Sequence, residues 1–226
     1  MKKSYFITAI DTDAGKSIAT GLLARYLAEK GTSVITQKMA QTGCAGASED
    51  IETHRRIMGV PAFAEDENGL TCPYVFPFPA APQLAAALAG EKISLEKIHE
   101  TTVRLEEKYD CVLTEGVGGL MVPLADDLTV LDYMGRYPQP AILVAHCKLG
   151  SVNHTLLSLE ALKNRGVALT GILYNRFSET HPVITADSFQ TLRRCLERCF
   201  PQAALVELPR WEVGMQTPDF SDLFRN

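Results

Sequence analysis

The stretch FITAIDTDAGKSIATGLL, residues 6–23, decides the fold of this chain. A short β-rich run at 5–9 enters a polar turn and then a helical pattern, whose buried side carries the apolar residues Leu22, Leu23, Tyr26 and Leu27. A strand that passes through such a turn into a helix forms an anion site, because the first N–H groups of the helix point at the anion. The stretch therefore predicts a phosphate-binding loop in an α/β fold.

Three residues of this turn carry the chemistry. Gly15 lets the backbone approach a phosphate, Lys16 reaches the β and γ oxygens as a cation, and Ser17 offers its hydroxyl to Mg²⁺. The common pattern G-x-x-x-x-G-K-[ST] has a glycine where this chain has Ile10. A bare Gly-Lys-Ser can also begin an ordinary helix. Here the strand, the turn and the helix all fall where a phosphate site needs them, so we interpret the stretch as a nucleotide site.

Short apolar runs alternate with helical patterns along the whole chain. The expected strands are 5–9, 33–37, 111–114, 141–145, 169–174 and 204–207. The expected helices are 16–29, 50–58, 82–89, 95–108, 153–163 and 189–199. This alternation is typical of βαβ units, so we expect an α/β fold like that of P-loop NTPases: a doubly wound, mostly parallel sheet with helices on both faces. A length of 226 residues fits a single domain, 1–226.

The composition indicates which kinds of molecule the protein binds. A net charge of -5 gives no general basic surface for nucleic acid or anionic lipid. The N-terminal apolar run ends at Asp11, which is too short for a secretory signal, and no stretch approaches the roughly 20 apolar residues that cross a bilayer. We therefore expect a cytoplasmic protein with small-molecule partners, no nucleic acid and no membrane, and six reduced cysteines.

A second set of polar residues lies in DCVLTEGVGGLMVPLADD, residues 110–127. The expected strand at 111–114 ends in Glu115, and the glycines that follow are Gly116, Gly118 and Gly119. Ligands of open α/β sheets lie beyond the carboxyl ends of the strands, so a carboxylate there can face a nucleotide and its metal. The alternative is a simple glycine turn in which Glu115 only caps a loop.

Two further residues follow the second expected strand. Lys38 precedes, and Asp50 lies within, a long segment at 39–82 that interrupts the alternation. Lys38 stands just past the strand, where a lysine can hold a phosphate or a carboxylated substrate, or remain solvated at the surface. Asp50 begins a helix, and acids are favoured there by the dipole alone. Together with Ser17 and Glu115, however, Asp50 would complete a hard-oxygen Mg²⁺ site.

Asn175 ends the expected strand in ILYNRF. Its side-chain amide offers a donor and an acceptor, which match the N6 and N7 edge of adenine. The alternative, which the sequence favours equally, is that the Asn175 side chain only forms hydrogen bonds within a turn.

Taken together, these residues resemble the family of ATP-dependent dethiobiotin synthetases. The loop AIDTDAGKS, residues 9–17, is similar to the family's G-T-D-T-x-V-G-K-T, with Ala9 in place of the first glycine. TEGVGGLMVPLAD, residues 114–126, is similar to E-G-A-G-G followed by Pro-Leu, and KLGSVNHTLL, residues 148–157, to K-L-G-x-I-N-H. ELPRWE, residues 207–212, resembles the family's I/L-P segment. The match extends over most of the chain in the same order.

The resemblance implies an ATP-dependent cyclo-ligase, a dethiobiotin synthase of biotin biosynthesis. Its substrates would be 7,8-diaminononanoate, ATP and CO₂ supplied by bicarbonate, with Mg²⁺ as the cofactor. The diamine would form a carbamate, ATP would convert it to a carbamic-phosphoric anhydride, and the second amine would close the cyclic urea. The family also implies a homodimer with the active site at the subunit interface.

The resemblance also assigns residues. The catalytic residues would be Lys38, Lys16 and Thr12, and the Mg²⁺ ligands would be Ser17, Asp50 and Glu115. The ATP-binding residues would be Asp13, Ala14, Gly15, Lys16, Ser17, Ile18, Asp50, Glu115, Gly116, Val117, Gly118, Asn175, Arg176, Leu208 and Pro209. The substrate-binding residues would be Thr12, Lys38, Thr42, Gly150, Ser151 and Asn153. The last three open a helix that the other subunit would supply, and its N-terminal amides would bind the substrate carboxylate.

Two departures from the family give further expectations. Ala9 adds a methyl group that must fit beside the phosphates, or else the strand must shift. AAPQ, residues 80–83, replaces an S-P-H segment of the family near the substrate, so contacts there should differ.

The alternative function is a nucleotide-switch ATPase of the partition or site-selection type, which shares this sheet and an unusual loop. Those proteins carry a second lysine near the start of the loop, where this chain has residues 9–12, and a surface for membrane or DNA, which the acidic composition does not favour. An amide ligase of cobalamin synthesis is a closer relative, but we expect no room for the glutamine-hydrolysing domain that it needs.

Overall fold

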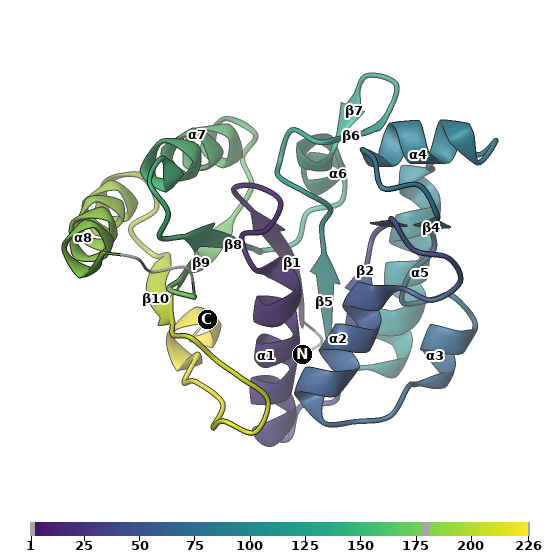
Figure 1. Cartoon of the computed structure of the whole chain (residues 1–226), viewed down its shortest axis with the longest axis horizontal. Helices are drawn as coiled ribbons and strands as arrows, with labels where there is room; N and C mark the ends of the chain where they lie inside the picture. The colour runs from purple at the N-terminus through teal and green to yellow at the C-terminus, as the bar shows by residue number, and fades with distance from the viewer. Residues whose placement is uncertain (1–2, 178–180, 226) are drawn as a thin grey trace.

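The computed structural model describes residues 3–177 and 181–225. Its centre is a sheet of six strands in the order β10-β9-β8-β1-β5-β2, and every neighbouring pair is parallel (Figure 1). The strands are β1 (Lys3–Ala9), β2 (Val34–Lys38), β5 (Cys111–Glu115), β8 (Ala141–His146), β9 (Leu169–Asn175) and β10 (Ala204–Leu208). The predicted α/β fold with a parallel sheet is confirmed, and all six expected strands are present.

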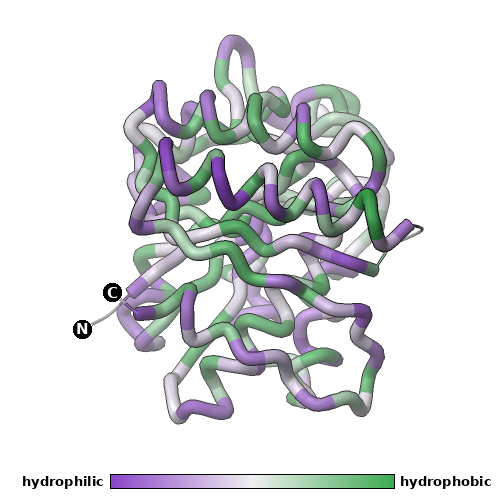
Figure 2. The backbone as a smooth tube through the Cα atoms, turned by 90° about the vertical axis from the view of Figure 1, so that its left-hand side faces the viewer, coloured by the Kyte–Doolittle hydropathy of each residue, from purple (hydrophilic) through white to green (hydrophobic). Residues whose placement is uncertain are grey.

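Helices cover both faces of this sheet. On one face, α1 (Lys16–Glu29) packs over the centre of the sheet and α2 (Glu49–Met58) packs against α1. On the other face lie α5 (Leu95–Lys108), α6 (Val130–Arg136), α7 (Ser151–Asn164) and α8 (Pro182–Cys199). In Figure 2 the helices nearest the viewer alternate between hydrophilic and hydrophobic residues along the tube, as expected of helices that bury one side.

Helix α8 begins seven residues before the expected start at 189. Pro182 opens the helix, where its fixed φ angle and missing N–H cost nothing. The first turns bury the small polar residues Thr185 and Ser188 instead of large apolar ones. A search for apolar periodicity therefore misses these turns.

Short elements that the sequence did not suggest fill the connections. They are the parallel pair β3 (Gln41–Thr42) and β4 (Val75–Phe76), the antiparallel pair β6 (Pro123–Ala125) and β7 (Leu128–Thr129), α3 (Ala64–Glu67), and a 3₁₀ helix at Ser221–Phe224. The expected helix at 82–89 is present as α4 (Pro82–Leu88). Within the described ranges, no helix has both the length and the apolarity that a membrane span requires.

The parallel strands end at one edge of the sheet, and most of them end in polar residues. Strands β2, β5, β8 and β9 each run one residue further than expected, to Lys38, Glu115, His146 and Asn175. All four side chains are buried or nearly so. Because ligands of open α/β sheets lie at this edge, these four residues indicate a ligand site there.

Candidate active site

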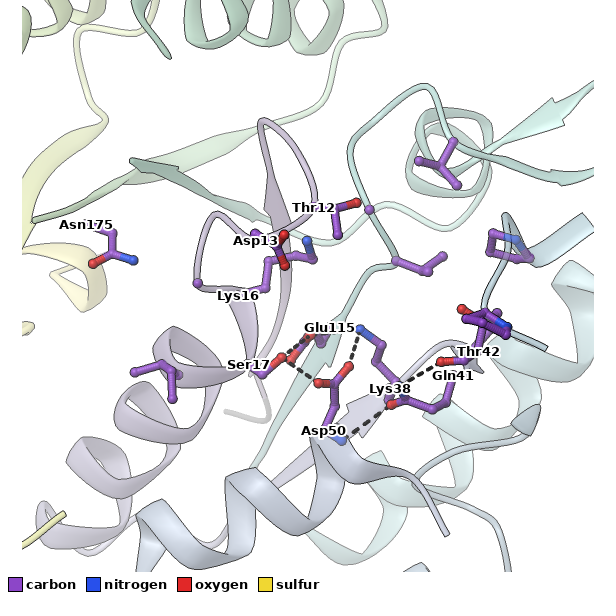
Figure 3. A pocket seen from close by; sticks show the side chains of 18 of the residues that line it. Thr12, Asp13, Lys16, Ser17, Lys38, Gln41, Thr42, Asp50, Glu115 and Asn175 are labelled. Carbon is purple, nitrogen blue, oxygen red and sulfur yellow. Dashed lines mark hydrogen bonds and ion pairs between the residues drawn. The ribbon is translucent and has the colours of Figure 1, made fainter. Parts of the chain in front are cut away.

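A cavity of about 840 Å³ opens at the carboxyl edge of the sheet, beside the loop between β1 and α1 (Figure 3). Of the residues predicted from the sequence, those that line it are Thr12, Asp13, Gly15, Lys16, Ser17, Ile18, Lys38, Thr42, Asp50, Glu115, Val117, Gly118, Asn175, Leu208 and Pro209. The structure thus brings together residues that are up to about two hundred positions apart in sequence. A cavity of this size suits a small-molecule ligand.

The loop has a backbone that requires glycine at one position. Gly15 caps α1 with a φ angle of +94°, in the left-handed region. A Cβ atom on Gly15 would lie 2.3 Å from Nδ2 of Asn175, so any side chain would collide there. Asn175 in turn donates from Nδ2 to the Ala14 carbonyl at 3.0 Å. The end of β9 therefore braces the loop at the point where the helix begins.

Lys16 follows this glycine and is buried in the loop, where its Nζ donates to the Asp11 carbonyl at 3.2 Å. Burial, together with the charge of Lys38, lowers the pKa of Lys16 to about 8, although nearby carboxylates act in the opposite direction. A triphosphate beside the ammonium would supply the negative charge that favours its protonated form.

The methyl group of Ala9 does not lie beside the phosphate site, where the sequence placed it. It is fully buried in the apolar layer beneath α1, with Ile7 and Ala14, and Ala9 is absent from the described residues that line the cavity. The expected conflict with phosphates is therefore wrong, because the side chain at the end of β1 points into the core.

Three oxygen atoms from distant elements meet on one side of the cavity. Oγ of Ser17 lies 2.7 Å from Oδ1 of Asp50 and 3.1 Å from Oε1 of Glu115. Neighbouring oxygens around an octahedral Mg²⁺, with Mg–O distances of about 2.1 Å, lie about 3 Å apart. Two carboxylates and a hydroxyl at this spacing fit Mg²⁺, which commonly takes its remaining ligands from water and substrate phosphates.

Lys38 completes this cluster as a cation. Its Nζ lies 2.7 Å from Oδ2 of Asp50 and donates to Oε1 of Glu115 at 2.8 Å and to the Gly116 carbonyl at 3.0 Å. Burial would lower the pKa of Lys38, but the carboxylates of Glu115 and Asp50 raise it above its ordinary value. The side chain is therefore a permanent positive charge in the cavity.

Asp50 is held in place through the start of its helix. Ser48 caps α2 by accepting a hydrogen bond from the Ile51 amide, and Ser48 donates its own hydroxyl to Oε1 of Gln41 at 2.8 Å. The same Gln41 oxygen accepts from the Asp50 amide at 3.3 Å. The loop after β2 thus fixes the end of α2 that carries Asp50, and a dashed line in Figure 3 marks the bond from the Asp50 amide to Gln41.

Glu115 is held from behind by a residue that the sequence reasoning missed. His54 is fully buried, and its Nε2 lies 2.7 Å from Oε2 of Glu115. Burial would raise the pKa of Glu115, but the charge of Lys38 and the hydrogen bond from His54 hold it well below its ordinary value. The sequence could have indicated His54 as a site residue, because it follows Asp50 by four positions and so shares its helix face.

Asn175 lies at the opposite end of the cavity from Lys38 (Figure 3). Besides its bond to the Ala14 carbonyl, its Oδ1 accepts from the Phe177 amide at 3.0 Å. An amide has a second N–H and a second lone pair. The predicted contact with adenine therefore remains a prediction, now for an amide that also has a structural role.

Some predicted residues lie outside the lining of the cavity. Ala14 is buried in the core, Gly116 donates its amide to the Ile7 carbonyl within the sheet, and Arg176 pairs with Glu207 at 3.3 Å on the surface. Gly150, Ser151 and Asn153 stand at the start of α7, away from this cavity of their own chain.

The cavity also has walls that the sequence did not predict. Half come from the segment at 79–82 and from the C-terminal loop. The unpredicted residues are Ala40, Gln41, Pro79, Ala80, Ala81, Pro82, Val122, Pro123, Phe177 and Trp211. The segment at 79–82 overlaps AAPQ, where the sequence departs from its family pattern, and that departure was the available signal.

Comparisons with known proteins bear on this site and on the whole chain. A family model described as an AAA domain matches residues 3–210. The ATP-dependent dethiobiotin synthetase BioD 2 of Pasteurella multocida (strain Pm70) is 51% identical over 201 residues, which cover 89% of this chain and 94% of that protein. The ATP-dependent dethiobiotin synthetase BioD of Chlorobaculum tepidum is 48% identical over 203 residues, which cover 89% and 85%.

Among solved structures, a ParA family ATPase from Chlorobium tepidum TLS aligns with a TM-score of 0.56 at 13% identity, covering 99% of this chain and 88% of that one. At that identity the likeness shows the shared fold alone, so the nucleotide-switch alternative is not favoured over relatives with about half of their residues in common. The chain belongs to the ATP-dependent dethiobiotin synthetase family.

Proposed function

We propose that the chain catalyses the ATP-dependent closure of 7,8-diaminononanoate with CO₂ to dethiobiotin. The observation that carries the proposal is the cluster of Lys38, Asp50, Glu115 and Ser17, which lies beside the phosphate loop in one cavity. In this cluster the ammonium of Lys38 lies beside oxygens of Ser17, Asp50 and Glu115 that suit Mg²⁺. Membership of the dethiobiotin synthetase family indicates which reaction this cluster would catalyse.

The reaction would proceed in three steps. One amine of the substrate adds to CO₂ and loses a proton, which gives a carbamate. A carbamate oxygen then attacks the γ-phosphorus of ATP, releasing ADP and forming a carbamic-phosphoric anhydride. The second amine finally attacks the carbonyl carbon and loses a proton, and inorganic phosphate leaves as the ring closes. Phosphorylation is needed because an oxygen of the free carbamate is a poor leaving group.

The residues divide this work according to their positions. Gly15 and the N-terminal amides of α1 would cradle the phosphates, and Lys16 would neutralise the γ-phosphate. Ser17, Asp50 and Glu115 would hold Mg²⁺, which when bound compensates the charge of the phosphate oxygens.

Lys38 would stabilise the charge that gathers between the carbamate and the γ-phosphate. Thr12 and Thr42, which both line the cavity, would hold the carbamate end of the substrate. The apolar lining at Pro79, Pro82 and Val122 suits the hydrocarbon chain of a diamino acid. Holding the reactants together removes much of the entropic barrier.

We propose further that two copies of the chain form a homodimer and that each supplies Gly150, Ser151 and Asn153 to the other's site. Two observations support this arrangement. These residues lie outside the cavity of their own chain, and apolar side chains near them are open to solvent, with Leu149 90%, Met121 66% and Leu157 62% exposed. Exposed apolar groups that lie close together mark interaction surfaces.

We also propose that residues 1–226 form one domain, since one sheet organises the described chain, and that the protein works in the cytoplasm. All six cysteines are free thiols, which fits a reducing compartment. The proposed partners are thus small molecules and a second copy of the chain.

Incubation of the purified chain with 7,8-diaminononanoate, bicarbonate, Mg²⁺ and ATP tests the function. We expect dethiobiotin, detected by mass spectrometry, to form in step with ADP. Omission of the diamine should remove both products, and Lys16→Ala should abolish both because it loses the phosphate contact. ADP release that does not depend on the diamine, without dethiobiotin, would overturn the proposal.

A further inference from the structure

His54 makes two contacts that link the site to the interior of the protein. Its Nε2 lies 2.7 Å from Oε2 of Glu115, and its Nδ1 lies 2.9 Å from Oγ1 of Thr36 on β2. All three side chains are fully buried, so neither contact is exchanged with solvent. The ring therefore connects the proposed Mg²⁺ ligand to a hydroxyl behind it.

Arg55 contacts the same Thr36 hydroxyl as His54. Its Nη1 donates to Oγ1 of Thr36 at 2.8 Å, and a guanidinium can only donate. The hydroxyl therefore accepts from Arg55 while it also contacts Nδ1 of His54. The carboxylate of Glu115 can only accept, so Nε2 of His54 carries a proton and donates it to Oε2.

Arg55 is itself immobilised. Its Nε and Nη2 donate to the two carboxylate oxygens of Asp66 at 2.8 Å and 2.7 Å, in the bidentate geometry that fixes a guanidinium plane. Its cationic carbon lies 4.6 Å from the centre of the Phe63 ring. Asp66, Arg55 and Thr36 therefore form one connected set of hydrogen bonds behind His54.

We propose that His54 is a positioning residue for Glu115, which it holds by Oε2 so that Oε1 is presented to Ser17, Lys38 and the nucleotide-bound Mg²⁺. The inference rests on the proposed function only in naming Mg²⁺ and ATP as the groups that meet Oε1. The two oxygens of Glu115 already have separate partners, since Oε1 contacts Ser17 and Lys38 and Oε2 contacts His54.

Loss of His54 would leave Oε2 buried with its hydrogen bond unmade. An unmade bond is costly for a buried charged group, and Glu115 would no longer be held with Oε1 toward the metal. Substitution of a residue that orients a metal ligand typically weakens metal binding by about 10-fold to 100-fold.

The test measures Mg²⁺ binding by isothermal titration calorimetry in the presence of a non-hydrolysable ATP analogue. His54→Leu removes the donor at similar volume, whereas His54→Gln keeps an N–H at the end of the side chain. We expect His54→Leu to raise the Kd for Mg²⁺ by about tenfold or more and His54→Gln to recover most of this loss. The Kd of the analogue measured without Mg²⁺ should stay the same in both variants.

A second variant keeps His54 and removes the hydroxyl that contacts its Nδ1. Thr36→Val replaces the hydroxyl by a methyl group of the same shape, so it should shift the Kd for Mg²⁺ in the same direction but by less. Thr8→Val is the matched control, because Thr8 is also a buried threonine in the central sheet and its Oγ1 has no partner among the described residues. If His54→Leu fails to fold, His54→Gln, Thr36→Val and Thr8→Val still decide the question.

Unchanged Mg²⁺ binding in His54→Leu, or equal shifts in Thr36→Val and Thr8→Val, would overturn the proposal. So would a wild-type protein that binds the analogue without any effect of Mg²⁺. The result is separable from the proposed function, because the titration needs no turnover. A wild type that forms no dethiobiotin but shows the His54 dependence would refute the function alone, and the reverse outcome would refute this inference alone.

Discussion

Lys38 places its ammonium between the two carboxylates that also face Ser17. It lies 2.7 Å from Asp50 and 2.8 Å from Glu115, and with its third bond to the Gly116 carbonyl its donors are fully used. Removal of this cation leaves two carboxylates close together in a buried site, which is costly without a replacement charge. Mg²⁺ is a replacement of the right sign at the same oxygens.

Replacement of Lys38 by methionine should therefore make stability dependent on Mg²⁺. We expect Lys38→Met to lower the free energy of unfolding without metal by roughly 3 to 5 kcal/mol and Mg²⁺ to restore part of this loss. Thermal unfolding with EDTA and with Mg²⁺ measures the effect. Lys163→Met, at an exposed position on α7, is the control and should respond to neither. Equal Mg²⁺ responses in wild type and Lys38→Met would contradict the expectation.

Gly15 combines two constraints that a matched pair of variants separates. An alanine at Gly15 would be strained by the φ angle of +94° and would collide with Asn175, whereas an alanine at Gly31, with a φ angle of +84°, would meet no atom within 4 Å. Both variants should lose stability by about 1 kcal/mol through backbone strain. Only Gly15→Ala should also lose ATP affinity, because Asn175 must move and the loop with it.

Urea unfolding and calorimetric titration with ATP report these two effects independently. If Gly31→Ala weakened ATP binding as much as Gly15→Ala, strain alone would explain the loss, and the contact with Asn175 would not matter.

At the scale of elements, the sequence located every strand of the sheet but stopped five of them one residue short, and four of the five missed residues are polar. Lys38, Glu115, His146 and Asn175 look like loop residues because they are polar, yet they are paired in the sheet and buried. Hydrogen-bond and ion-pair partners on other elements offset the cost of burying them, as His54 does for Glu115. Partners that meet only in the folded chain leave no mark in a local apolar pattern.

Helix α2 is a second case in which contacts between elements could not be predicted from the local pattern. Asp50 was predicted as a site residue, but the role of the next turn was not, although it carries His54 and Arg55. The short helix α3, which supplies Asp66 to Arg55, was missed altogether. Four residues with no apolar periodicity give no helical signal, and this helix depends on the contact with α2.

The contact between α2 and α3 should be sensitive to pH. Burial would raise the pKa of Asp66, but the hydrogen bonds from Arg55 and the Phe63 amide hold it below its ordinary value of 3.8. A carboxylate with a lowered pKa stabilises the fold above its unfolded pKa, and the contribution is lost as the pH falls through the folded value. We expect Asp66→Asn to cost roughly 1 to 3 kcal/mol at pH 7 and progressively less below about pH 4.

Urea unfolding of wild type and Asp66→Asn across this range measures the difference. Asp187→Asn, at an exposed position on α8, should leave the free energy of unfolding nearly unchanged throughout. A cost of Asp66→Asn that stayed constant as the pH fell would show that the ion pair is not the stabilising contact.

At the scale of the whole molecule, the sequence was most informative where the topology is simple. Parallel strands bring their carboxyl ends to one edge, so residues at 12–17, 38, 115 and 175 could be placed in one site before any contact was known. The walls at Pro79 and Trp211 could not, because they come from irregular segments whose path is set by packing. The residues at 150–153 are absent from the lining of the cavity of their own chain.

The proposed dimer predicts that two inactive variants restore each other. Lys38→Ala damages the cavity of its own chain, whereas Asn153→Glu places a negative charge at the N-terminus of α7, where it is exposed, compatible with the helix dipole and repellent to a substrate carboxylate. In a heterodimer of the two, one site combines Lys38 and Asn153 from undamaged positions. Random pairing after co-expression should therefore return about a quarter of the wild-type dethiobiotin formation. If each chain held a complete site, every site in the mixture would carry one defect, and activity would stay at the level of the separate variants.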